Sequence, residues 1–460
     1  MSTRSERDSL GTVEVPAEAL WGAQTQRAVD NFRISGQAMP TAFLRALARI
    51  KGAAARASQA LGGLDETRAG AIAAVAEAIA GGEHAEAFPV EVFQTGSGTS
   101  SNMNMNEVIA RLAGQRGVEV HPNDDVNRSQ SSNDVVPSAI QLAATDRLMN
   151  ALMPALAHLR AVIGERATAL AEVAKTGRTH LMDAMPLTFG QELGTWDAQL
   201  AGCQAALREC LPRLAALPLG GTAIGTGINA ADGFAERAVA ELQRATGLPV
   251  SAADNRFEGI AGQQAALELA AKLAALAVVL GKIANDLRWM NSGPLAGLGE
   301  ISLPALQPGS SIMPGKVNPV ICEAVVMLAA QVQGCHLAVS LGAQGGNFQL
   351  NTMLPLIAHN LLPPIDWLAE GMRLLAEKAI AGFEVNRERI EQNLSRNPIL
   401  VTALNPLIGY EKAAAIAKRA YREQRTVLEV ALEDSGLDEA TLKRALDPLK
   451  LTRGGEAGGE

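Results

Sequence analysis

The segment Pro308–Asn318 (PGSSIMPGKVN) holds the densest group of side chains that could do chemistry. Its prolines and glycines exclude a helix, because proline lacks an N–H and glycine weakens a helix interior. Glycines permit a loop that opens and closes over a site. Ser310 and Ser311 can exchange protons, and Lys316 supplies a positive charge for a carboxylate. Ordinary surface loops rarely mix apolar residues such as Ile312 with these groups, so we interpret the segment as a functional loop.

A second polar segment, Thr95–Asn106 (TGSGTSSNMNMN), contains two glycines, five hydroxyl side chains and three asparagines. It could be the N-terminal cap of a helix over Met105–Leu112, since Ser, Thr and Asn are the usual capping residues. A cap needs only one or two such residues, however. We therefore favour a ligand-contacting loop, whose hydroxyls and N–H groups at a helix N-terminus suit a carboxylate.

The segment His121–Asp134 (HPNDDVNRSQSSND) precedes the longest expected helix. Ser132, Asn133 or Asp134 could cap that helix. Ser131–Asn133 could equally donate hydrogen bonds to an anionic substrate at the helix terminus. Both interpretations stay open on the sequence alone.

The segment Thr176–His180 (TGRTH) is expected at the end of that long helix. There His180 could cap the C-terminus, where the macrodipole favours a cation, and the sequence alone slightly favours this interpretation. Alternatively His180 transfers protons, because an imidazole with a pKa of about 6.5 exchanges a proton with bound water at neutral pH. Glu323, one to two turns into the helix after the loop, could orient a histidine from another helix.

Together these groups suit removal of a proton from a carbon beside a carboxylate. That reaction builds a dianionic aci-carboxylate, which lysine, asparagine and N–H donors can stabilise without a metal. It needs one group for the carbon proton and another for the leaving group, and the sequence offers one serine of the 310–311 pair and His180. The chain has no HExxH, paired CxxC or GxxxxGK[ST] spacing. Gly220–Asn229 (GGTAIGTGIN) lies between helical segments rather than after a strand, so we expect neither a metal nor a cofactor.

Long helices are expected to position these groups. Hydrophobic residues make up 48% and aromatic residues 3% of the 460 residues, and apolar residues recur every three or four positions. Helices this long usually pack into an elongated bundle and bury further apolar faces against other subunits, so we expect a mainly α chain and an obligate oligomer. The expected long helices cover Ser138–Lys175, Leu187–Leu214, Gly262–Asn291, Pro319–Leu341 and Pro355–Ala381.

The chain divides into three expected regions. Residues 1–137 form a mixed, mainly helical N-terminal domain with a strand-like TVEVP near its start. Residues 138–390 form the central long-helix bundle. Residues 391–460 form a small helical domain whose helices are separated at Asn397-Pro398 and Asn405-Pro406. Its final GGEAGGE is expected to be disordered.

Charge and composition limit the partners. The net charge of −8 and the pI of about 5.5 provide no basic field for nucleic acid. The N-terminus lacks the apolar core of a secretion signal, and the long apolar stretch Ala265–Met290 contains too many charges to span a bilayer. The four cysteines lack CxxC spacing and fit apolar filler in a reducing cytoplasm. We expect a cytoplasmic protein with no nucleic-acid or membrane partner.

Six motifs occur in the order in which one known family has them. They are EVPAEALWGAQTQRAVDNFRI, TGSGTSSNMNMNEV, HPNDDVNRSQSSND, GRTHLMDAMPLTFGQE, GGTAIGTGIN and GSSIMPGKVNP. Through them nearly the whole chain resembles the class II fumarases, the iron-independent fumarate hydratases of the fumarase/aspartase superfamily. The resemblance implies an elongated long-helix bundle with smaller N- and C-terminal domains, assembled as a homotetramer whose active sites are each built from three subunits. It also implies cofactor-free, reversible anti addition of water to fumarate, giving L-malate, in the tricarboxylic acid cycle.

The resemblance further implies roles for individual residues. Ser310 is expected to act as the base on carbon and His180 to handle the water, with the reverse assignment open, while Glu323 keeps the imidazole basic. The expected substrate contacts are Ser97, Gly98, Thr99, Ser131, Ser132, Asn133, Thr179, Ser311, Lys316, Val317 and Asn318. The segment that resembles the family's accessory dicarboxylate site consists of His121, Pro122, Asn123 and Asp124. Val118 replaces the basic residue of that site, so we expect it to be weak or absent.

Aspartate ammonia-lyase is the nearest alternative, because it shares the loop and the fold. His180 favours a hydratase, since the ammonia-lyases typically carry glutamine there, and the SSN of Ser131–Asn133 fits fumarases better than the STN of aspartases. Val320-Ile321 after KVNP points the other way. Argininosuccinate and adenylosuccinate lyases share only the general loop pattern. The intact set of chemical side chains argues against a non-catalytic structural protein of the same fold.

Overall fold

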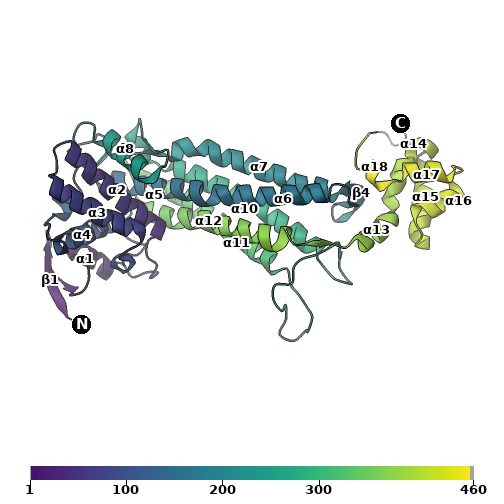
Figure 1. Cartoon of the computed structure of the whole chain (residues 1–460), viewed down its shortest axis with the longest axis horizontal. Coiled ribbons are helices and arrows are strands. Elements are labelled where there is room, and N and C mark those ends of the chain that lie inside the picture. Colours follow the sequence, from purple (N-terminus) through teal and green to yellow (C-terminus); the bar gives the residue numbers. More distant parts are fainter. Residues whose placement is uncertain (1, 456–460) are drawn as a thin grey trace. The chain divides into compact units, whose positions relative to one another are not determined.

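A computed structural model describes residues 2–455, which are mainly helical, as the sequence predicts (Figure 1). They fall into two compact units. Unit 1 runs to Pro154 and includes Cys203–Ala277 and Leu328–Glu370, while unit 2 comprises Ala155–Gly202, Val278–Met327 and the chain from Gly371 onward. The division falls inside the long helices, which are α6 (Met153–Ala169), α7 (Phe189–Leu214), α10 (Gln264–Met290), α11 (Val320–Ala343) and α12 (Leu354–Leu375).

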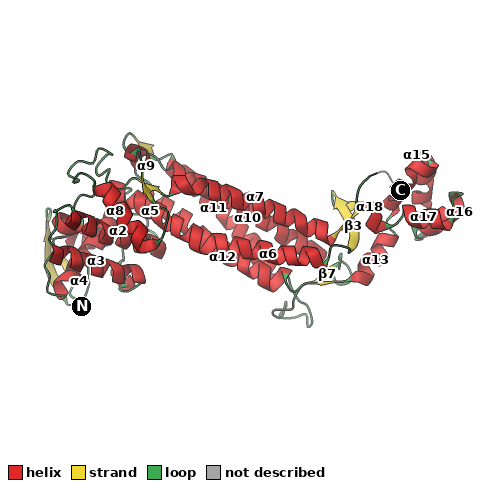
Figure 2. Cartoon of the chain, turned by 45° about the horizontal axis from the view of Figure 1, so that its top comes forward, coloured by secondary structure: helices red, strands yellow, loops and turns green. Residues whose placement is uncertain are grey.

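The remaining elements are short helices and two-stranded sheets, and Figure 2 shows how little of the described chain is strand. Those of unit 1 are β1 (Thr3–Asp8), β2 (Gly11–Pro16), α1 (Ala23–Asn31), α2 (Thr41–Ala60), α3 (Glu66–Gly81), η1 (Ala85–Ala87), α4 (Thr99–Gln115), η2 (Pro122–Val126), α5 (Ser132–Arg147), η3 (Leu148–Leu152), β5 (Ala216–Leu217), α8 (Phe234–Thr246), β6 (Ser251–Ala252), α9 (Arg256–Ala261), β8 (Gly346–Asn347) and β9 (Leu350–Asn351). Those of unit 2 are β3 (Ala174–Thr179), β4 (Met182–Thr188), β7 (Ile301–Ser302), η4 (Ala376–Ile380), β10 (Glu384–Val385), α13 (Arg387–Ser395), η5 (Pro398–Leu404), α14 (Asn405–Ile408), α15 (Tyr410–Glu423), α16 (Val427–Asp434), α17 (Glu439–Ala445) and α18 (Pro448–Leu451). The division of the sequence at 137 and 390 stays a prediction, and residues 456–460 of the expected tail lie outside the described residues.

Helices α2 and α3 lie side by side in unit 1 (Figure 1). Alanines and a glycine let their backbones approach, and a Cβ placed on Gly52 of α2 would lie 3.4 Å from the Cβ of Ala76 in α3. The buried face of α2 carries Phe43, Leu47 and Ile50, each of which stabilises the fold by roughly 1.5–3 kcal/mol when fully buried. One charged side chain, that of Lys51, shares this buried face.

The expected helix Ser138–Lys175 is correct as far as Ala169 and wrong beyond it. Helix α5 ends at Arg147, the π-helical turn η3 follows, and α6 ends at Ala169, after which the chain forms the hairpin β3–β4. The π turn directly precedes Pro154, whose missing N–H and bulky ring remove a regular helical bond and force a wider turn. The other long helices agree with the predicted ranges to within a few residues.

Helix α11 is the helix of the described chain that is long and apolar enough to cross a membrane by length and composition. The sequence suggests Ala265–Met290 as the most apolar long stretch, but several charges interrupt that stretch, whereas Glu323 is the one Asp, Glu, Lys or Arg in α11. Length and composition are weak evidence for a span, since a bundle helix passes the same test. Only 22% of its most apolar window is buried, and Met327, Leu337 and Leu341 are exposed. This helix therefore has a large apolar face that the single chain leaves uncovered.

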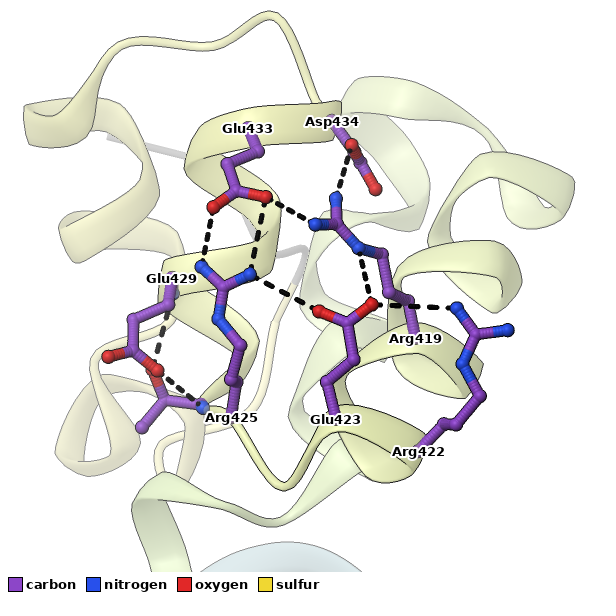
Figure 3. Close-up of polar contacts among 8 residues, drawn as sticks. Arg419, Arg422, Glu423, Arg425, Glu429, Glu433 and Asp434 are labelled. Carbon is purple, nitrogen blue, oxygen red and sulfur yellow. Dashed lines mark hydrogen bonds and ion pairs between the residues drawn. The ribbon is translucent and has the colours of Figure 1, made fainter.

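The C-terminal part of unit 2 has its own apolar core and a network of exposed ion pairs. Leu400, Leu404, Ile416 and Val430 belong to the core. Figure 3 shows the network. The Arg419 guanidinium donates to Glu423, Glu433 and Asp434. The Arg425 guanidinium donates to both oxygens of Glu433. Two guanidinium groups thus share three carboxylates that join α15 to α16.

We predict that Arg419→Met destabilises the C-terminal part in a pH-dependent manner. Hydrogen bonds from Arg425 and Arg419 lower the pKa of Glu433 to about 2. A carboxyl group with a depressed pKa in the folded state adds stability above its unfolded pKa, and this contribution is lost as the pH falls toward about 2. The Tm measured by calorimetry should therefore fall at pH 7 and change little near pH 2.5. Lys443→Met, which removes a single exposed pair with Glu439, is the control. Equal losses at both pH values would contradict the prediction.

Candidate active site

His180 lies at the tip of the β3–β4 hairpin and not at the end of a helix, so the expected helix cap is wrong. His180 and Leu181 form the two-residue turn with φ angles of 55° and 60°, the left-handed conformation that tight hairpins require. The strand register shifts at Gly177, where a Cβ would lie 2.5 Å from the carbonyl oxygen of Met185. Thr179 and His180 are both exposed. The hairpin therefore presents an imidazole to its surroundings on a short, defined turn.

A buried ion cluster anchors this hairpin. The Lys175 ammonium lies 2.8 Å from carboxylate oxygens of both Glu192 and Glu300, and Arg178 lies 2.6 Å from the other oxygen of Glu300. The side chains of Lys175 and Glu300 are only 2% and 3% exposed. Removing one partner of such a cluster leaves an uncompensated buried charge, which costs about 3–5 kcal/mol. Sequence reasoning missed this anchor, although a lysine two residues after the buried Val173 was a signal for it.

The segment Pro308–Asn318 is a loop, as predicted, and hydrogen bonds close it at its base. The Gly309 N–H donates to the Lys316 carbonyl at 2.8 Å, and the Asn318 amide donates to the Gly309 carbonyl at 2.7 Å. Gly309 is required there, because a Cβ would lie 2.5 Å from the Lys316 oxygen. The tip is open to solvent, with Ile312 83% exposed.

Ser310 occupies a distinct position within this loop. Its Oγ accepts hydrogen bonds from the backbone N–H groups of Ile312 and Met313, at 3.2 and 3.1 Å. N–H donors directed at an oxygen stabilise its charged form. Ser311, Lys316 and Val317 are exposed on the same loop. Among the described residues, Lys316 has no carboxylate within ion-pair distance.

Glu323 lies in the first turn of α11 and is half-buried. Its backbone N–H donates to the Pro319 carbonyl. Within the described part of this single chain, no hydrogen bond joins Glu323 to His180. The expected pairing of these two residues stays a prediction.

The polar segment Thr95–Asn106 is a loop as far as Gly98 and a helix from Thr99 onward. Helix α4 begins at Thr99, six residues before the expected start, and Gly98 precedes it with a φ of 73°. The N-cap Gly98 has no capping side chain, and Gln94 Oε1 instead accepts from the Ser101 N–H at 3.0 Å, so the predicted cap by a Ser, Thr or Asn of this segment is wrong. The Ser97 and Thr99 hydroxyls lie 2.8 Å apart and share a hydrogen bond. The asparagines beyond them are buried in α4 and serve packing: Asn104, for example, donates to the Ala87 carbonyl.

Ser131 and Asp134 form a capping box at the start of α5, so this segment does cap the helix, but the N-cap residue is Ser131, one position before those predicted. The Asp134 carboxylate accepts from the Ser131 N–H at 2.8 Å and from the Gly220 and Thr222 N–H groups at 2.9 Å. Burial raises the pKa of Asp134 to about 6, while these N–H donors oppose the shift. Asn133 donates to the Ala223 carbonyl at 2.8 Å. The glycine-rich segment 220–229 thus lies against the start of α5.

These contacts bring three polar segments of unit 1 together. Asn102 of α4 donates to the Ser132 hydroxyl at 3.2 Å, and a Cβ on Gly98 would lie 2.8 Å from Val136. A cavity of about 630 Å³ is lined by Ser131, Thr222 and Asn229, among others. The hairpin, the loop and Glu323 belong to unit 2. The predicted site residues therefore fall on both units.

The expected accessory segment forms the turn η2. The His121 imidazole Nδ1 accepts from the N–H groups of Asn123 and Asp124, at 3.3 and 3.1 Å. His121, Pro122 and Asn123 line a cavity of about 1110 Å³, and Asp124 lines the cavity of about 630 Å³. The arginines that line the larger cavity are Arg4, Arg7, Arg68 and Arg111. Basic groups are thus present there despite Val118.

No group of three or more His, Cys, Asp or Glu side chains that could hold a metal ion occurs among residues 2–455.

Comparisons with known proteins place the chain in one family. The family profile described as "Lyase" matches residues 11–334, and that described as "Fumarase C C-terminus" matches residues 400–453. The chain is 60% identical to "Fumarate hydratase class II" of Xylella fastidiosa over 98% of its own length and 96% of that protein. It is 57% identical to "Fumarate hydratase class II 2" of Pseudomonas aeruginosa, over 98% and 99%. A crystal structure of the class II fumarase of Schistosoma mansoni superimposes with a TM-score of 0.94 at 36% identity, covering 98% of this chain and 99% of that one.

These relationships extend over nearly the whole of both chains. They also agree with the family that the six motifs predicted. The chain therefore belongs to the class II fumarate hydratase family.

Proposed function

We propose that this protein catalyses the reversible anti addition of water to fumarate, giving L-malate, through an aci-carboxylate intermediate. The observation that carries the proposal is the 60% identity to a class II fumarate hydratase over 98% of the chain, with the histidine and the serine loop both present. The geometry around Ser310 and His180 supports the same chemistry.

Ser310 is the proposed base on carbon. In the direction from malate, the Ser310 alkoxide takes the proton from the carbon that does not carry the hydroxyl, and an aci-carboxylate dianion forms. The two N–H groups at its Oγ support this role, because they stabilise an oxyanion. Lys316 and Asn318 of the same loop neutralise the charge that develops on the carboxylate.

His180 is the proposed acid for the second step. The carbon–oxygen bond breaks, the electron pair closes the double bond, and the leaving hydroxyl takes a proton from the imidazolium and departs as water. Solvent then restores both groups to their starting states. In the direction from fumarate, every step is reversed. Glu323 is proposed to pair with His180 and to keep its imidazole basic.

The proposed substrate contacts come from two helix N-termini, the hairpin and the loop. Ser97, Gly98 and Thr99 lie at the start of α4, and Ser131, Ser132 and Asn133 at the start of α5. Helix N-termini favour anions, because their free N–H groups and dipoles point outward. The remaining proposed contacts are Thr179, Ser311, Lys316, Val317 and Asn318.

The protein is proposed to act as a homotetramer in which three subunits build each site. The exposed apolar face of α11 supports an assembly, because a soluble protein rarely leaves a face of that size in water. A shared site also provides the pairing between His180 and Glu323 that one chain does not make. The accessory segment His121–Asp124 is proposed to bind a second dicarboxylate.

The cytoplasm is the proposed compartment. The four cysteines are free, namely Cys203, Cys210, Cys322 and Cys335. Burial raises the pKa of Cys210 to about 11 and that of Cys322 to about 12. Thiols of this kind stay protonated and are compatible with a reducing environment.

We predict that the purified protein converts L-malate to fumarate without added metal or ammonium. The ultraviolet absorbance of fumarate should rise after L-malate is added. Aspartate is the comparison substrate, because Val320-Ile321 resembles the ammonia-lyases. Fumarate from aspartate but not from malate would assign the ammonia-lyase activity instead, and fumarate from neither would favour a structural role.

We predict that His180→Asn lowers kcat about 100-fold or more, because one acid/base group is lost. Size-exclusion chromatography with light scattering should show the same assembly as the wild type. Leu181→Asn is a matched control, because asparagine tolerates the positive φ of that turn position without replacing the imidazole. Full activity in His180→Asn would remove His180 from the mechanism.

We predict that Leu337→Arg breaks the assembly. Leu337 is 60% exposed on α11, and a charge on a buried subunit interface lacks a partner and opposes association. The wild-type mass in solution should be about four times 48.0 kDa, and the variant mass should be lower. Activity should fall with the mass, since each site needs three subunits. An active monomer would refute the shared site.

A further inference from the structure

Lys51 is a buried cation that the proposed mechanism does not use. It lies on α2 and is 0% exposed. Its ammonium donates to two amide oxygens, Asn127 Oδ1 and Gln130 Oε1, each at 3.0 Å. The buried Lys175, by contrast, contacts two carboxylates directly. Within the described residues no carboxylate lies at ion-pair distance from Lys51, so its burial costs free energy that an apolar residue would not cost.

The Asn127 side chain, which accepts from Lys51, is the centre of a polar network. Asn127 Oδ1 also accepts from the amides of Asn102 and Asn106, at 3.1 and 3.2 Å. The Asn127 amide in turn donates to the Gln130 carbonyl at 3.2 Å. One amide oxygen therefore accepts from an ammonium and from two residues of α4. Because these donors compete for the same oxygen, the position of Asn127 depends on all of them.

The network reaches both groups of proposed substrate contacts in unit 1. Asn102 lies one turn into α4, after Ser97–Thr99, and it also donates to the Ser132 hydroxyl at 3.2 Å. Gln130 directly precedes Ser131–Asn133. A displacement of Asn127 would therefore move the start of α4 relative to the start of α5.

A second buried charge lies on the other side of Ser131–Asn133. Asp134 is 0% exposed, and its charge raises the pKa of Lys51. Burial has the larger effect and lowers the pKa of Lys51 to about 7. Two other charged groups on neighbouring elements have partners of their own: Glu107 of α4 accepts from the backbone of Gly22, and Arg68 of α3 pairs with Asp65 and with Asp125 of η2. Asp134 is thus the carboxylate that offsets the Lys51 charge.

We propose that Lys51 is a positioning residue of the dicarboxylate site, which acts through Asn127 to fix Ser97–Thr99 relative to Ser131–Asn133. This inference rests on the proposed function, since it takes these residues as the substrate contacts. Lys51 itself does not touch the substrate. Its N–H donors set the spacing of the two helix N-termini that hold one carboxylate.

The expected signature is a change in KM rather than in kcat. Ser97–Thr99 and Ser131–Asn133 hold the carboxylate in both the ground state and the transition state, whereas the proton-transfer groups lie on other segments. Loss of uniform binding raises KM and leaves kcat nearly constant. Lys51→Met, which keeps the length of the side chain and removes the charge and its N–H donors, should raise KM for L-malate about tenfold or more and change kcat less than about threefold.

Two further variants test whether Lys51 acts through Asn127. Asn127→Ala should raise KM to a similar extent. The double variant should be no worse than either single one, because residues that act in one chain of contacts are not additive. Ile50→Val, a neighbouring buried change on α2, is the control for loosened packing and should keep the wild-type KM. Additive effects, or an unchanged KM in folded Lys51→Met, would overturn the proposal. If Lys51→Met does not fold, an unchanged KM in Asn127→Ala overturns it equally.

A binding measurement separates this inference from the proposed reaction. Succinate is a dicarboxylate that cannot react, and at equal concentration it should raise the Tm of the wild-type protein more than that of Lys51→Met. If the wild type shows this shift and yet produces no fumarate from malate, the proposed reaction fails while the role of Lys51 stands. If the wild type hydrates fumarate and both proteins show the same shift and the same KM, only the role of Lys51 fails.

Discussion

The carboxylate of Asp134 is the interaction on which the candidate site in unit 1 depends. It is buried, and it accepts backbone N–H groups from Ser131 and from two positions that lie 86 and 88 residues further along the chain. These bonds fix where α5 begins and hold the glycine-rich segment against that end. A buried carboxylate without them would cost several kcal/mol. The polar segments could not keep their places without this acceptor, since none of them is part of a regular sheet.

The apolar periodicity was enough to predict the long helices, and the prolines around Ser310 were enough to predict the loop. Repeats of three and four residues are a strong signal when they extend over twenty positions, and the prolines around Ser310 leave no alternative to a loop. The family and its fold could be predicted for another reason, namely the order of six motifs along the chain.

The local structure around His180 could not be predicted in this way. Its hairpin is short, a bulge at Gly177 interrupts the alternation, and the turn residues His180 and Leu181 are not the glycine or asparagine that mark such turns. The start of α4 was missed because its asparagines suggested a loop, whereas tertiary hydrogen bonds satisfy them inside a helix. Lys51 and Lys175 were missed too, because their partners lie far away in sequence. Whether Glu323 meets His180 in the proposed assembly cannot be predicted from the periodicity of one chain.

The closure of the Ser310 loop at its base also bears on how such a protein can change over time. Both closing hydrogen bonds involve backbone atoms of Gly309. Its N–H donates to the Lys316 carbonyl, and its carbonyl accepts from the Asn318 amide. The exposed residues at the tip, Ile312 and Met313, take no part in this closure through their side chains. Mutations at the tip can therefore accumulate without refolding the attachment points. The side chains at the tip can thus vary while Ser310 keeps its place.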